Sequence, residues 1–246
     1  MDAVIIAAGY GSRLASLSPS KPLTPVCGVP LIEIGIRQAA AAGVTRVVVV
    51  TGHRAEAVEG FLADLAHRVN VEIEPVRVAD WSKPNGYSVM AGAERCEGDY
   101  LLMMADHMFD SAILAALSNV GDKARDVTLA IDFHTDSPLV DPDDATWVKL
   151  STNGFISAIG KSIPTWDAVD CGAFLATPRL AEAVAAAIAS GKPGSLSDGM
   201  QWLADRGRAA TYDIGEAWWM DVDDPRAHTL AEELAPRHLT AAFAAT

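Results

Sequence analysis

The chain has 246 residues, half of them hydrophobic, which is enough to bury one large core. Its formal net charge of −13 argues against a broad nucleic-acid-binding surface, so an anionic ligand must meet local cationic side chains or a metal ion held by carboxylates. No apolar stretch approaches the ~20 residues that cross a bilayer and no export leader opens the sequence, so we expect a cytoplasmic protein without direct membrane insertion.

The first predicted element is the buried strand Val4–Ala8, which runs into the glycine turn Gly9-Tyr10-Gly11-Ser12-Arg13-Leu14. Such a turn exposes backbone N–H groups to a phosphate oxygen, and Arg13 and Lys21 add positive charge nearby. A P-loop would continue as Gly-Lys-Ser/Thr, and a dinucleotide fingerprint would place a third glycine or an alanine where Leu14 stands. The prolines that follow exclude a long helix directly after the turn. We therefore predict a polyphosphate-binding loop of another kind, with a plain glycine turn carrying exposed basic residues as the alternative.

Strands and helices then alternate through the first half of the chain. Continuous apolar strands separated by helices indicate a mainly parallel sheet that is covered on both faces. Ligands of such sheets gather at the carboxyl ends of the strands, where the glycine turn and Asp106 both fall. We expect strands at Val4–Ala8, Arg46–Thr51, Val71–Val76, Tyr100–Met104 and Val127–Ile131, and helices at Leu31–Ala42, Glu56–Leu65, Tyr87–Arg95 and Ser111–Leu117.

The second half is less regular, with short strands around turns such as Asn153-Gly154. No proline- or glycine-rich linker separates the halves, so we expect one α/β domain with a smaller β-containing region. The expected strands are Trp147–Leu150, Phe155–Ile159, Cys171–Thr177 and Ala209–Ile214, and the expected helices are Ala181–Ala189, Ser197–Arg206 and Pro225–Glu233.

Three carboxylates stand where a metal ion can bind. Asp106 follows the apolar strand Tyr100–Met104, and a carboxylate at a buried strand end is costly unless it is paired, hydrogen-bonded or bound to an ion. Asp221 and Asp223 alternate with apolar residues and therefore project to one side of an extended segment. Hard oxygen ligands of this kind suit Mg²⁺, which takes one or two protein carboxylates together with phosphate oxygens.

Helix capping is the alternative for each of these aspartates. Asp106 precedes the helix predicted from Ser111 and would then belong to a turn or a cap. The other two precede a helix predicted to begin at Pro225, although Asp224 fits that cap better and leaves them free to bind a metal.

Further motifs follow the glycine loop in a fixed order. Together they resemble the CTP:inositol-1-phosphate cytidylyltransferase domain, a branch of the sugar nucleotidyltransferases, from Ala3 to about Asp223. The glycine loop is shared by the wider superfamily, whereas NGYS, DH and WMDVD are typical of the branch. The chain departs from the family in having Ala105 in place of glycine, and Cys171 and Asp224 in place of threonine. The motifs are Asn85-Gly86-Tyr87-Ser88, Asp106-His107, Ile159-Gly160-Lys161, Val169-Asp170-Cys171-Gly172 and Trp219-Met220-Asp221-Val222-Asp223.

The resemblance implies an α/β fold: a mostly parallel, Rossmann-like nucleotidyltransferase sheet flanked by helices, with a small β-containing acceptor region. It also implies one domain over residues 1–246, with a nucleotide-binding half at about 1–135 and an acceptor-binding half with a closing helix at about 136–246. The implied nucleotide-binding residues are Ala8, Gly9, Gly11, Ser12, Arg13, Lys21, Asn85, Gly86, Ser88 and Asp106.

The resemblance also implies roles in the reaction. The implied catalytic residues are Arg13, Lys21, Asp106 and Asp221, the implied Mg²⁺ ligands are Asp106, Asp221 and Asp223, and the implied acceptor-binding residues are His107, Lys161 and Asp170. Simpler interpretations stay open for several of them: a solvated surface lysine at 161, a plain turn at Asn85-Gly86, and a partly buried structural histidine at 107.

The activity implied is transfer of CMP from CTP to a phosphorylated polyol such as inositol 1-phosphate, which gives a CDP-alcohol and pyrophosphate. Because related domains are fused to a membrane CDP-alcohol phosphotransferase and this sequence carries no such segment, we expect a separate membrane enzyme of that kind downstream. One alternative is a cytidylyl- or uridylyltransferase for phosphocholine, a phosphonate or a sugar 1-phosphate, and another is a non-catalytic relative that senses nucleotide. The oligomeric state stays open, with a homodimer as one alternative.

Overall fold

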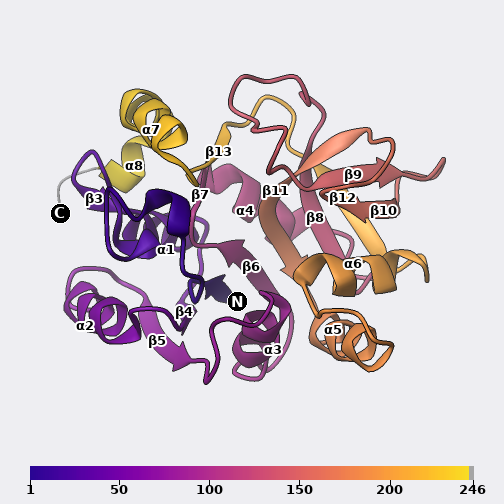
Figure 1. Cartoon of the computed structure of the whole chain (residues 1–246), viewed down its shortest axis with the longest axis horizontal. Helices are drawn as coiled ribbons and strands as arrows, with labels where there is room; N and C mark the ends of the chain where they lie inside the picture. The colour runs from indigo at the N-terminus through magenta and orange to yellow at the C-terminus, as the bar shows by residue number, and fades with distance from the viewer. Residues whose placement is uncertain (244–246) are drawn as a thin grey trace.

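The computed structural model describes residues 1–243, and its first half forms the predicted parallel sheet (Figure 1). The central strand β1 (Asp2–Ile6) pairs in parallel with β4 (Arg46–Thr51) and with β6 (Tyr100–Met104). Strand β4 pairs in parallel with β5 (Glu72–Arg77), which lies at the edge. Apart from the partly exposed residues at a few strand ends, the side chains of β1, β4 and β6 are buried.

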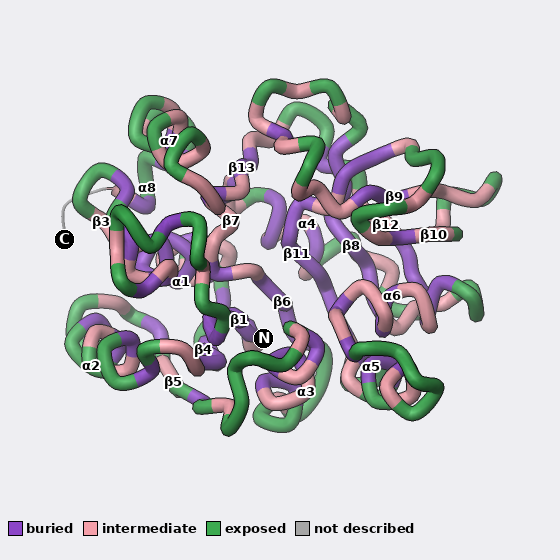
Figure 2. Tube along the Cα trace, viewed as in Figure 1, coloured by how far each residue is buried: buried purple, intermediate pink, exposed green. Residues whose placement is uncertain are grey.

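Helices cover both faces of the sheet, as the continuous apolar strands predict. They are α1 (Leu31–Ala41), α2 (Ala55–Leu65), α3 (Gly86–Ala93), α4 (Ser111–Val120), α5 (Arg179–Ala189) and α6 (Leu196–Ala204). Side chains of α1, α2 and α4 pack on one set of alternating strand residues, and those of α3, α5 and α6 pack on the other set. Figure 2 shows buried strands in the middle and exposed outer helix faces. Within residues 1–243, no helix combines the length and the apolar character that a membrane crossing requires.

Strand β11 (Ala168–Ala176) joins the second half of the chain to the same sheet. It pairs antiparallel with β6, with β8 (Val127–Asp132) and with β9 (Trp147–Leu150). Strand β9 also pairs antiparallel with β10 (Ile156–Gly160), and β8 also pairs in parallel with β12 (Ala209–Asp213). Among the described residues, one nine-stranded sheet therefore runs through both halves, parallel in the first half and largely antiparallel in the second.

Strand β11 begins at Ala168, earlier than the start predicted at Cys171. Its first residues pair with β9 and its last ones, Ala173–Ala176, pair with β6, and the register against β8 shifts between these parts. Gly172 lies in this irregularity with a φ of +75°, which favours glycine. The strand therefore starts before the predicted boundary and includes Asp170, which pairs with Ile131 of β8.

Short elements follow the glycine turn, in agreement with the prediction that no long helix begins there. Antiparallel pairing also joins two segments that are distant in sequence, β7 and β13. These elements, with the last one described, are the 3₁₀ helices η1 (Ser12–Leu14) and η2 (Lys21–Leu23), the hairpin β2 (Pro25–Val26) and β3 (Val29–Pro30), the strands β7 (His107–Phe109) and β13 (Trp219–Asp221), and the helix α8 (Thr240–Phe243).

The C-terminal helix α7 (Pro225–His238) extends past the predicted end at Glu233 and includes Pro236. Because proline has no N–H, the carbonyl of Glu232 loses its helical donor, and the thiol of Cys27 lies 3.2 Å from that oxygen. The carboxylate of Glu232 also accepts a hydrogen bond of 2.6 Å from the backbone N–H of Cys27. Helix α7 therefore holds the β2–β3 hairpin, which follows the glycine loop, in place.

A buried carboxylate on α1 provides a test of how this half is stabilised. Glu33 accepts hydrogen bonds from Arg37 at 2.6 Å and from both terminal nitrogens of Arg68 at 3.0 and 3.1 Å, with its side chain only 4% exposed. Hydrogen bonds to charged groups contribute about 1.5–3 kcal/mol, so Glu33→Gln is expected to lower the free energy of unfolding by that amount. Urea denaturation at pH 7 measures it.

The effect of Glu33→Gln should also depend on pH. Burial alone would raise the pKa of Glu33, but hydrogen bonds from Arg68 and Arg37 lower it below its ordinary value. The stabilisation is therefore complete above the unfolded-state pKa of about 4.3 and is lost as the pH falls through the folded-state pKa. Glu182→Gln, in an exposed pair with Arg179, is the control and should change stability by less than about 0.5 kcal/mol. A Glu33→Gln variant as stable as the unaltered protein would contradict this account.

Candidate active site

The site lies at the carboxyl ends of β1 and β6, as the sequence predicts for a sheet of this kind. The glycine loop leaves β1, and Asp106 follows the neighbouring strand β6. His107 then begins β7, and β7 pairs antiparallel with β13 so that His107 lies opposite Asp221. The backbone N–H of Val222 donates to the carbonyl of Asp106 at 2.9 Å. This short sheet brings together two carboxylates from opposite parts of the chain.

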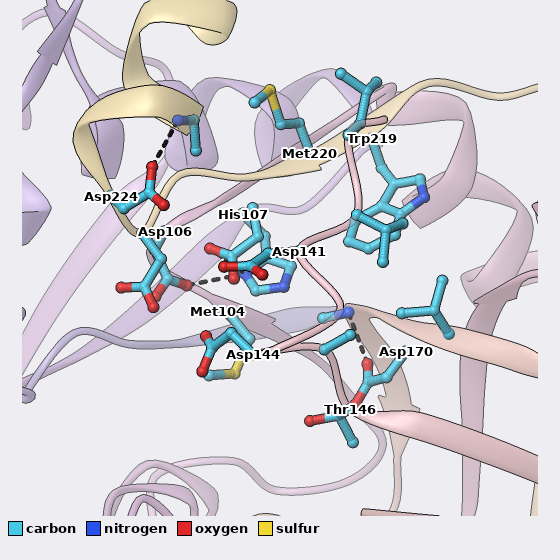
Figure 3. Close-up of a pocket in the computed structure, with 18 of the residues that line it drawn as sticks. Met104, Asp106, His107, Asp141, Asp144, Thr146, Asp170, Trp219, Met220 and Asp224 are labelled. Carbon is cyan, nitrogen blue, oxygen red and sulfur yellow. Dashed lines mark hydrogen bonds and ion pairs between the residues drawn. The ribbon is translucent and has the colours of Figure 1, made fainter. Parts of the chain in front are cut away.

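Four aspartates and one histidine surround the point where these elements meet. Oxygen or nitrogen atoms of Asp106, His107 and Asp221 lie within 4.8 Å of one another, and so do atoms of Asp144, Asp221 and Asp223. Figure 3 shows Asp106, His107 and Asp144 around one cavity. Capping does not explain Asp106, because Asp110 accepts from the N–H of Ala112 at the start of α4.

Asp224 caps the helix that begins at Pro225, as the sequence predicts. Asp224 has extended backbone geometry and its carboxylate accepts from the N–H of Ala227 at 2.7 Å, the interaction drawn in Figure 3. Asp221 and Asp223 are therefore not needed to cap α7, and both line a cavity instead.

The cationic residues of the glycine loop face these carboxylates. The Nζ of Lys21 lies 2.5 Å from Oδ2 of Asp106 and also contacts Asp223, with only 11% of its side chain exposed. Arg13 contacts Asp223 and makes an ion pair of 2.7 Å with Asp144. Gly11 allows this approach, because it has a φ of +61° and a Cβ there would lie 2.3 Å from the Cβ of Lys21.

The surroundings shift the pKa values of the two central carboxylates in opposite directions. Burial raises the pKa of Asp106, but the charge of Lys21 and the contacts of His107 outweigh it and hold the pKa far below its ordinary value. Burial and the negative charge of Asp106 raise the pKa of Asp221, although His107 opposes them. The Oδ1 of Asp221 is buried and has no hydrogen-bond partner among the described residues. An unpartnered oxygen beside an ionised carboxylate is a suitable ligand for a cation.

His107 contacts both central carboxylates and Trp219. Its Nδ1 lies 2.9 Å from Oδ1 of Asp106 and 3.8 Å from Oδ1 of Asp221. Its ring stacks on Trp219, whose Nε1 donates to Asp132 at 2.8 Å. Burial lowers the pKa of His107, but Asp221, Asp106 and Asp170 raise it to about 9. The imidazolium can therefore orient the carboxylates, while its place in the cavity wall leaves the predicted contact with an acceptor open.

Gly172 leaves the space that the ring of His107 occupies. A Cβ at Gly172 would lie 2.4 Å from Cδ2 of His107, and the φ of +75° disfavours any other residue. Gly172→Ala is therefore expected to displace the ring, to lower kcat, and to cost about 1–3 kcal/mol of stability beyond the backbone strain. Gly154→Ala is the control, because Gly154 has a φ of +81° but a Cβ there would have no atom of residues 1–243 within 4 Å. Equal loss of stability in both variants, by urea denaturation, would contradict the packing argument.

A cavity of about 360 Å³ lies over the glycine loop. Nearly all of the predicted nucleotide-binding residues line it: Ala8, Gly9, Gly11, Ser12, Arg13, Lys21, Asn85, Ser88 and Asp106. Gly86 does not line it, and a Cβ there would lie 2.3 Å from the carbonyl of Gly194, so this glycine serves the packing of α3 on the segment before α6. Asn85 is more than a turn residue, since its Oδ1 accepts from the N–H of Leu196 at 2.8 Å. We call this space the nucleotide cavity, after the residues predicted to bind the nucleotide.

A second cavity, of about 270 Å³, adjoins the first, and we call it the acceptor cavity, after the residues predicted to bind the acceptor. The predicted acceptor residues His107, Lys161 and Asp170 line it, and Lys161 contacts Asp144. Burial raises the pKa of Asp170 to about 6, although its carboxylate accepts from the N–H of Gly172. The residues that border both cavities are Arg13, Asn85, Met104, Asp106 and Asp223.

Two site residues were missed from the sequence. Asp144 contacts both Arg13 and Lys161, but it stands in a loop with several aspartates, and nothing in that loop distinguishes one from another. Trp81 lines the nucleotide cavity, from the loop between β5 and α3. Trp81 stands between Asp80 and Ser82 in an irregular loop, and no motif in that loop marks its tryptophan.

Comparison with protein families matches residues 3–198 to the model of the MobA-like NTP transferase domain. The chain belongs to this family. The predicted nucleotidyltransferase membership and the predicted sheet architecture are both confirmed.

Curated relatives of this NTP transferase include two proteins named bifunctional IPC transferase and DIPP synthase. The one from Rubrobacter xylanophilus is 33% identical over 240 residues, which is 95% of this chain and 52% of the relative. The one from Aquifex aeolicus is 30% identical over 227 residues, which is 91% of this chain and 49% of the relative. The chain thus spans about half the length of these relatives.

Among solved structures, the inositol-1-phosphate CTP transferase from T. maritima superposes with a TM-score of 0.82 at 23% identity, over 94% of this chain and 95% of that one. A UDP-glucose pyrophosphorylase superposes with a TM-score of 0.77 at 16% identity, over 96% and 98% of the two chains. At these identities the comparison establishes the fold.

Proposed function

We propose that this protein transfers CMP from CTP to inositol 1-phosphate, giving CDP-inositol and pyrophosphate. The observation that carries the proposal is that the nucleotide and acceptor cavities meet at Asp106, with Lys21 and Arg13 beside one and Lys161 and Asp170 beside the other. The names of the relatives and of the T. maritima structure support the choice of CTP and inositol 1-phosphate. The continuous sheet supports a single nucleotidyltransferase domain with a nucleotide half and an acceptor half.

The cluster of aspartates between the two cavities suits a magnesium ion. Asp106 stays ionised, Asp221 has an unpartnered buried oxygen, and Asp223 lies beside Asp221, so all three offer the hard oxygen ligands that Mg²⁺ prefers. Bound by Asp106 and Asp221, with Asp223 as a further ligand, Mg²⁺ would supply charge neutralisation between the two phosphate groups.

The chain's own residues then have distinct tasks. An oxygen of the acceptor phosphate attacks the α-phosphorus of CTP, the bond to the β-phosphate breaks, and pyrophosphate leaves with the bonding electrons. No general base is needed, because the attacking group is already an anion. Lys21 and Arg13 offset the charge that builds up at the α-phosphorus and on pyrophosphate. Lys161 binds the acceptor phosphate, and Asp170 accepts a hydrogen bond from a ring hydroxyl.

Before substrate binds, the cationic side chains of the site are already paired with carboxylates. Lys21 contacts Asp106 and Asp223, and Arg13 and Lys161 both contact Asp144. Phosphate oxygens would take the place of these carboxylates, because they are the charged partners that a guanidinium or an ammonium binds equally well. The cationic groups are thereby held near their working positions.

A direct assay tests the function. Purified protein is incubated with Mg²⁺, one of four nucleoside triphosphates, and inositol 1-phosphate, phosphocholine, a phosphonate or a hexose 1-phosphate, and both the nucleotide-linked product and pyrophosphate are measured. CDP-inositol as the main product supports the proposal. Faster turnover with another pair would assign the alternative transferase, and binding of CTP without any product would favour a nucleotide-sensing role.

The product places the enzyme before a step that consumes a CDP-alcohol. Relatives whose name includes a second, synthase activity support such a partner, which we propose to be a membrane CDP-alcohol phosphotransferase in phospholipid biosynthesis. The proposed location is the cytoplasm, where CTP is available.

A further inference from the structure

Three aromatic rings gather where Trp81 lines the nucleotide cavity. Trp81 lines this cavity together with Ala8 and Gly9, and it is 42% exposed. The ring of His53 lies 5.1 Å from that of Trp81, and the ring of Tyr10, in the glycine loop, lies 4.6 Å from that of His53. Three segments that are distant in sequence therefore contribute to one aromatic cluster.

The backbone fixes the position of this cluster. The N–H of His53 donates to the carbonyl of Ala8 at 2.9 Å, which joins the end of β4 to the glycine loop. A Cβ at Gly52 would lie 2.6 Å from the Cβ of Trp81 and 2.8 Å from the carbonyl of Ala8, so the segments are in direct contact. The carboxylate of Asp80 accepts from both the N–H and the hydroxyl of Ser82, which closes a turn around Trp81. The loop thus holds Trp81 at the cavity edge before any ligand binds.

The other tryptophans near the site are engaged elsewhere. Trp218 stacks on His238 at 5.0 Å, and Trp219 stacks on His107 and donates to Asp132. Of the nucleotide-cavity residues within 1–243, Trp81 is the aromatic one. A tryptophan that lines the cavity, is 42% exposed and packs beside two further rings offers the kind of surface on which a nucleobase stacks.

We propose that Trp81 binds the nucleobase of the triphosphate by stacking, with Tyr10 and His53 as positioning residues behind it. The inference rests on the proposed function, since it names a binding residue for that same nucleotide. Stacking does not read the edge of a base, because every base has a π-face. Trp81 therefore supplies affinity that is common to all nucleotides, and the choice of CTP depends on other groups of the cavity.

This division predicts a specific pattern of nucleotide affinities. Trp81→Ala is expected to weaken binding of CTP about 10- to 100-fold and to weaken UTP by a similar factor, which leaves the CTP-to-UTP ratio close to that of the unaltered protein. Trp81→Phe should retain most of the affinity, whereas Trp81→Leu, which is apolar but not aromatic, should behave like Trp81→Ala. If the role of Trp81 were merely structural, the CTP affinity would be equal in the three variants or would vary with their stability.

The experiment measures dissociation constants of CTP and UTP by calorimetry, without acceptor, so that turnover plays no part. Trp166→Ala is the matched control, because Trp166 is 43% exposed, stacks on Trp147 at 4.6 Å and lines neither cavity. It should bind CTP like the unaltered protein. Quenching of tryptophan fluorescence by CTP should be lost in Trp81→Phe and retained in Trp166→Phe.

The outcomes separate this inference from the proposed function. Weak binding by Trp81→Ala and Trp81→Leu, with near-normal binding by Trp81→Phe, supports stacking. Normal CTP binding by a folded Trp81→Ala overturns the role of Trp81 and leaves the transferase proposal intact. If the unaltered protein binds no nucleoside triphosphate, both proposals are overturned.

Discussion

Lys21→Ala is expected to lower kcat by roughly 10²- to 10³-fold while the dissociation constant of CTP changes much less. Lys21 lines the nucleotide cavity and is nearly buried, and its ammonium contacts the carboxylates of Asp106 and Asp223, which border both cavities. A cation in this position meets the charge that develops during transfer more than the charge of the bound triphosphate. Its contribution should therefore appear in the transition state, which lowers kcat and kcat/KM together.

The control for this variant is Lys149→Ala. Lys149 makes an ion pair of 2.7 Å with Asp167, is 37% exposed, and lines neither cavity. It should keep normal kcat and KM. Steady-state kinetics with varied CTP measure both variants. If Lys21→Ala kept the kcat of the unaltered protein and only its KM rose, Lys21 would have no role in the chemical step.

Asp221→Asn is expected to reduce kcat by roughly 10³-fold, since a metal ion contributes several kcal/mol of charge stabilisation and this variant weakens its binding. The same substitution should not lower the stability of the folded protein when divalent metal is absent. The raised pKa of Asp221, caused by burial and by Asp106, means that its ionised form destabilises the folded state. Without divalent metal, the variant should therefore unfold at an equal or higher temperature at pH 7.

The sign of this stability effect follows from protonation. A carboxyl with a raised folded-state pKa binds more protons when folded, so the stability of the unaltered protein falls as the pH rises from the unfolded pKa of about 3.9 to the folded value. The gain in Asp221→Asn should accordingly appear as the pH rises and vanish below that window. Thermal unfolding across this pH range, with and without Mg²⁺, measures it.

The matched control is Asp224→Asn. Asparagine is as good an N-cap as aspartate, so this variant removes a charge close to Asp221 and keeps the cap of α7. It should retain most of the activity and the stabilisation by Mg²⁺. Asp221→Asn with normal kcat, or with the same metal-dependent stabilisation as the unaltered protein, would contradict the role of Asp221.

The parts of the site that were predictable are those encoded in one short segment. The glycine loop and Asp106 each follow a continuous apolar strand, and the general rule for parallel sheets places both at the same edge. Asp224 was separable from Asp221 and Asp223 because it directly precedes a proline at a helix start. Local chemistry was sufficient for these residues.

The contacts between distant segments were not predictable by the same reasoning. Asp221 reaches Asp106 through the pairing of β7 with β13, and β7 is only three residues long, so its alternation pattern carries no signal. The carboxylates were paired through the family resemblance instead. Asp144 and Trp81 stand in irregular loops whose position depends on the whole fold, and neither residue type nor spacing marked them.

The early start of β11 shows a third kind of difference. A register shift between Asp170 and Phe174, with the positive φ of Gly172, interrupts the pairing of β11 with β8, and the predicted strand begins inside this interruption, at Cys171. The interruption has a purpose that only the packing reveals, since Gly172 makes room for His107. A glycine inside the predicted strand thus supports the packing of His107, which contacts the carboxylates of Asp106 and Asp221.

The most direct measurement is a crystal structure of the protein with Mg²⁺ and a CTP analogue that cannot be cleaved between the α- and β-phosphates. The account predicts an ion bound by Asp106 and Asp221, with the triphosphate on Gly9–Arg13 and its α-phosphate beside Lys21. An ion bound elsewhere, or a triphosphate that lies away from residues 9–21, would contradict it.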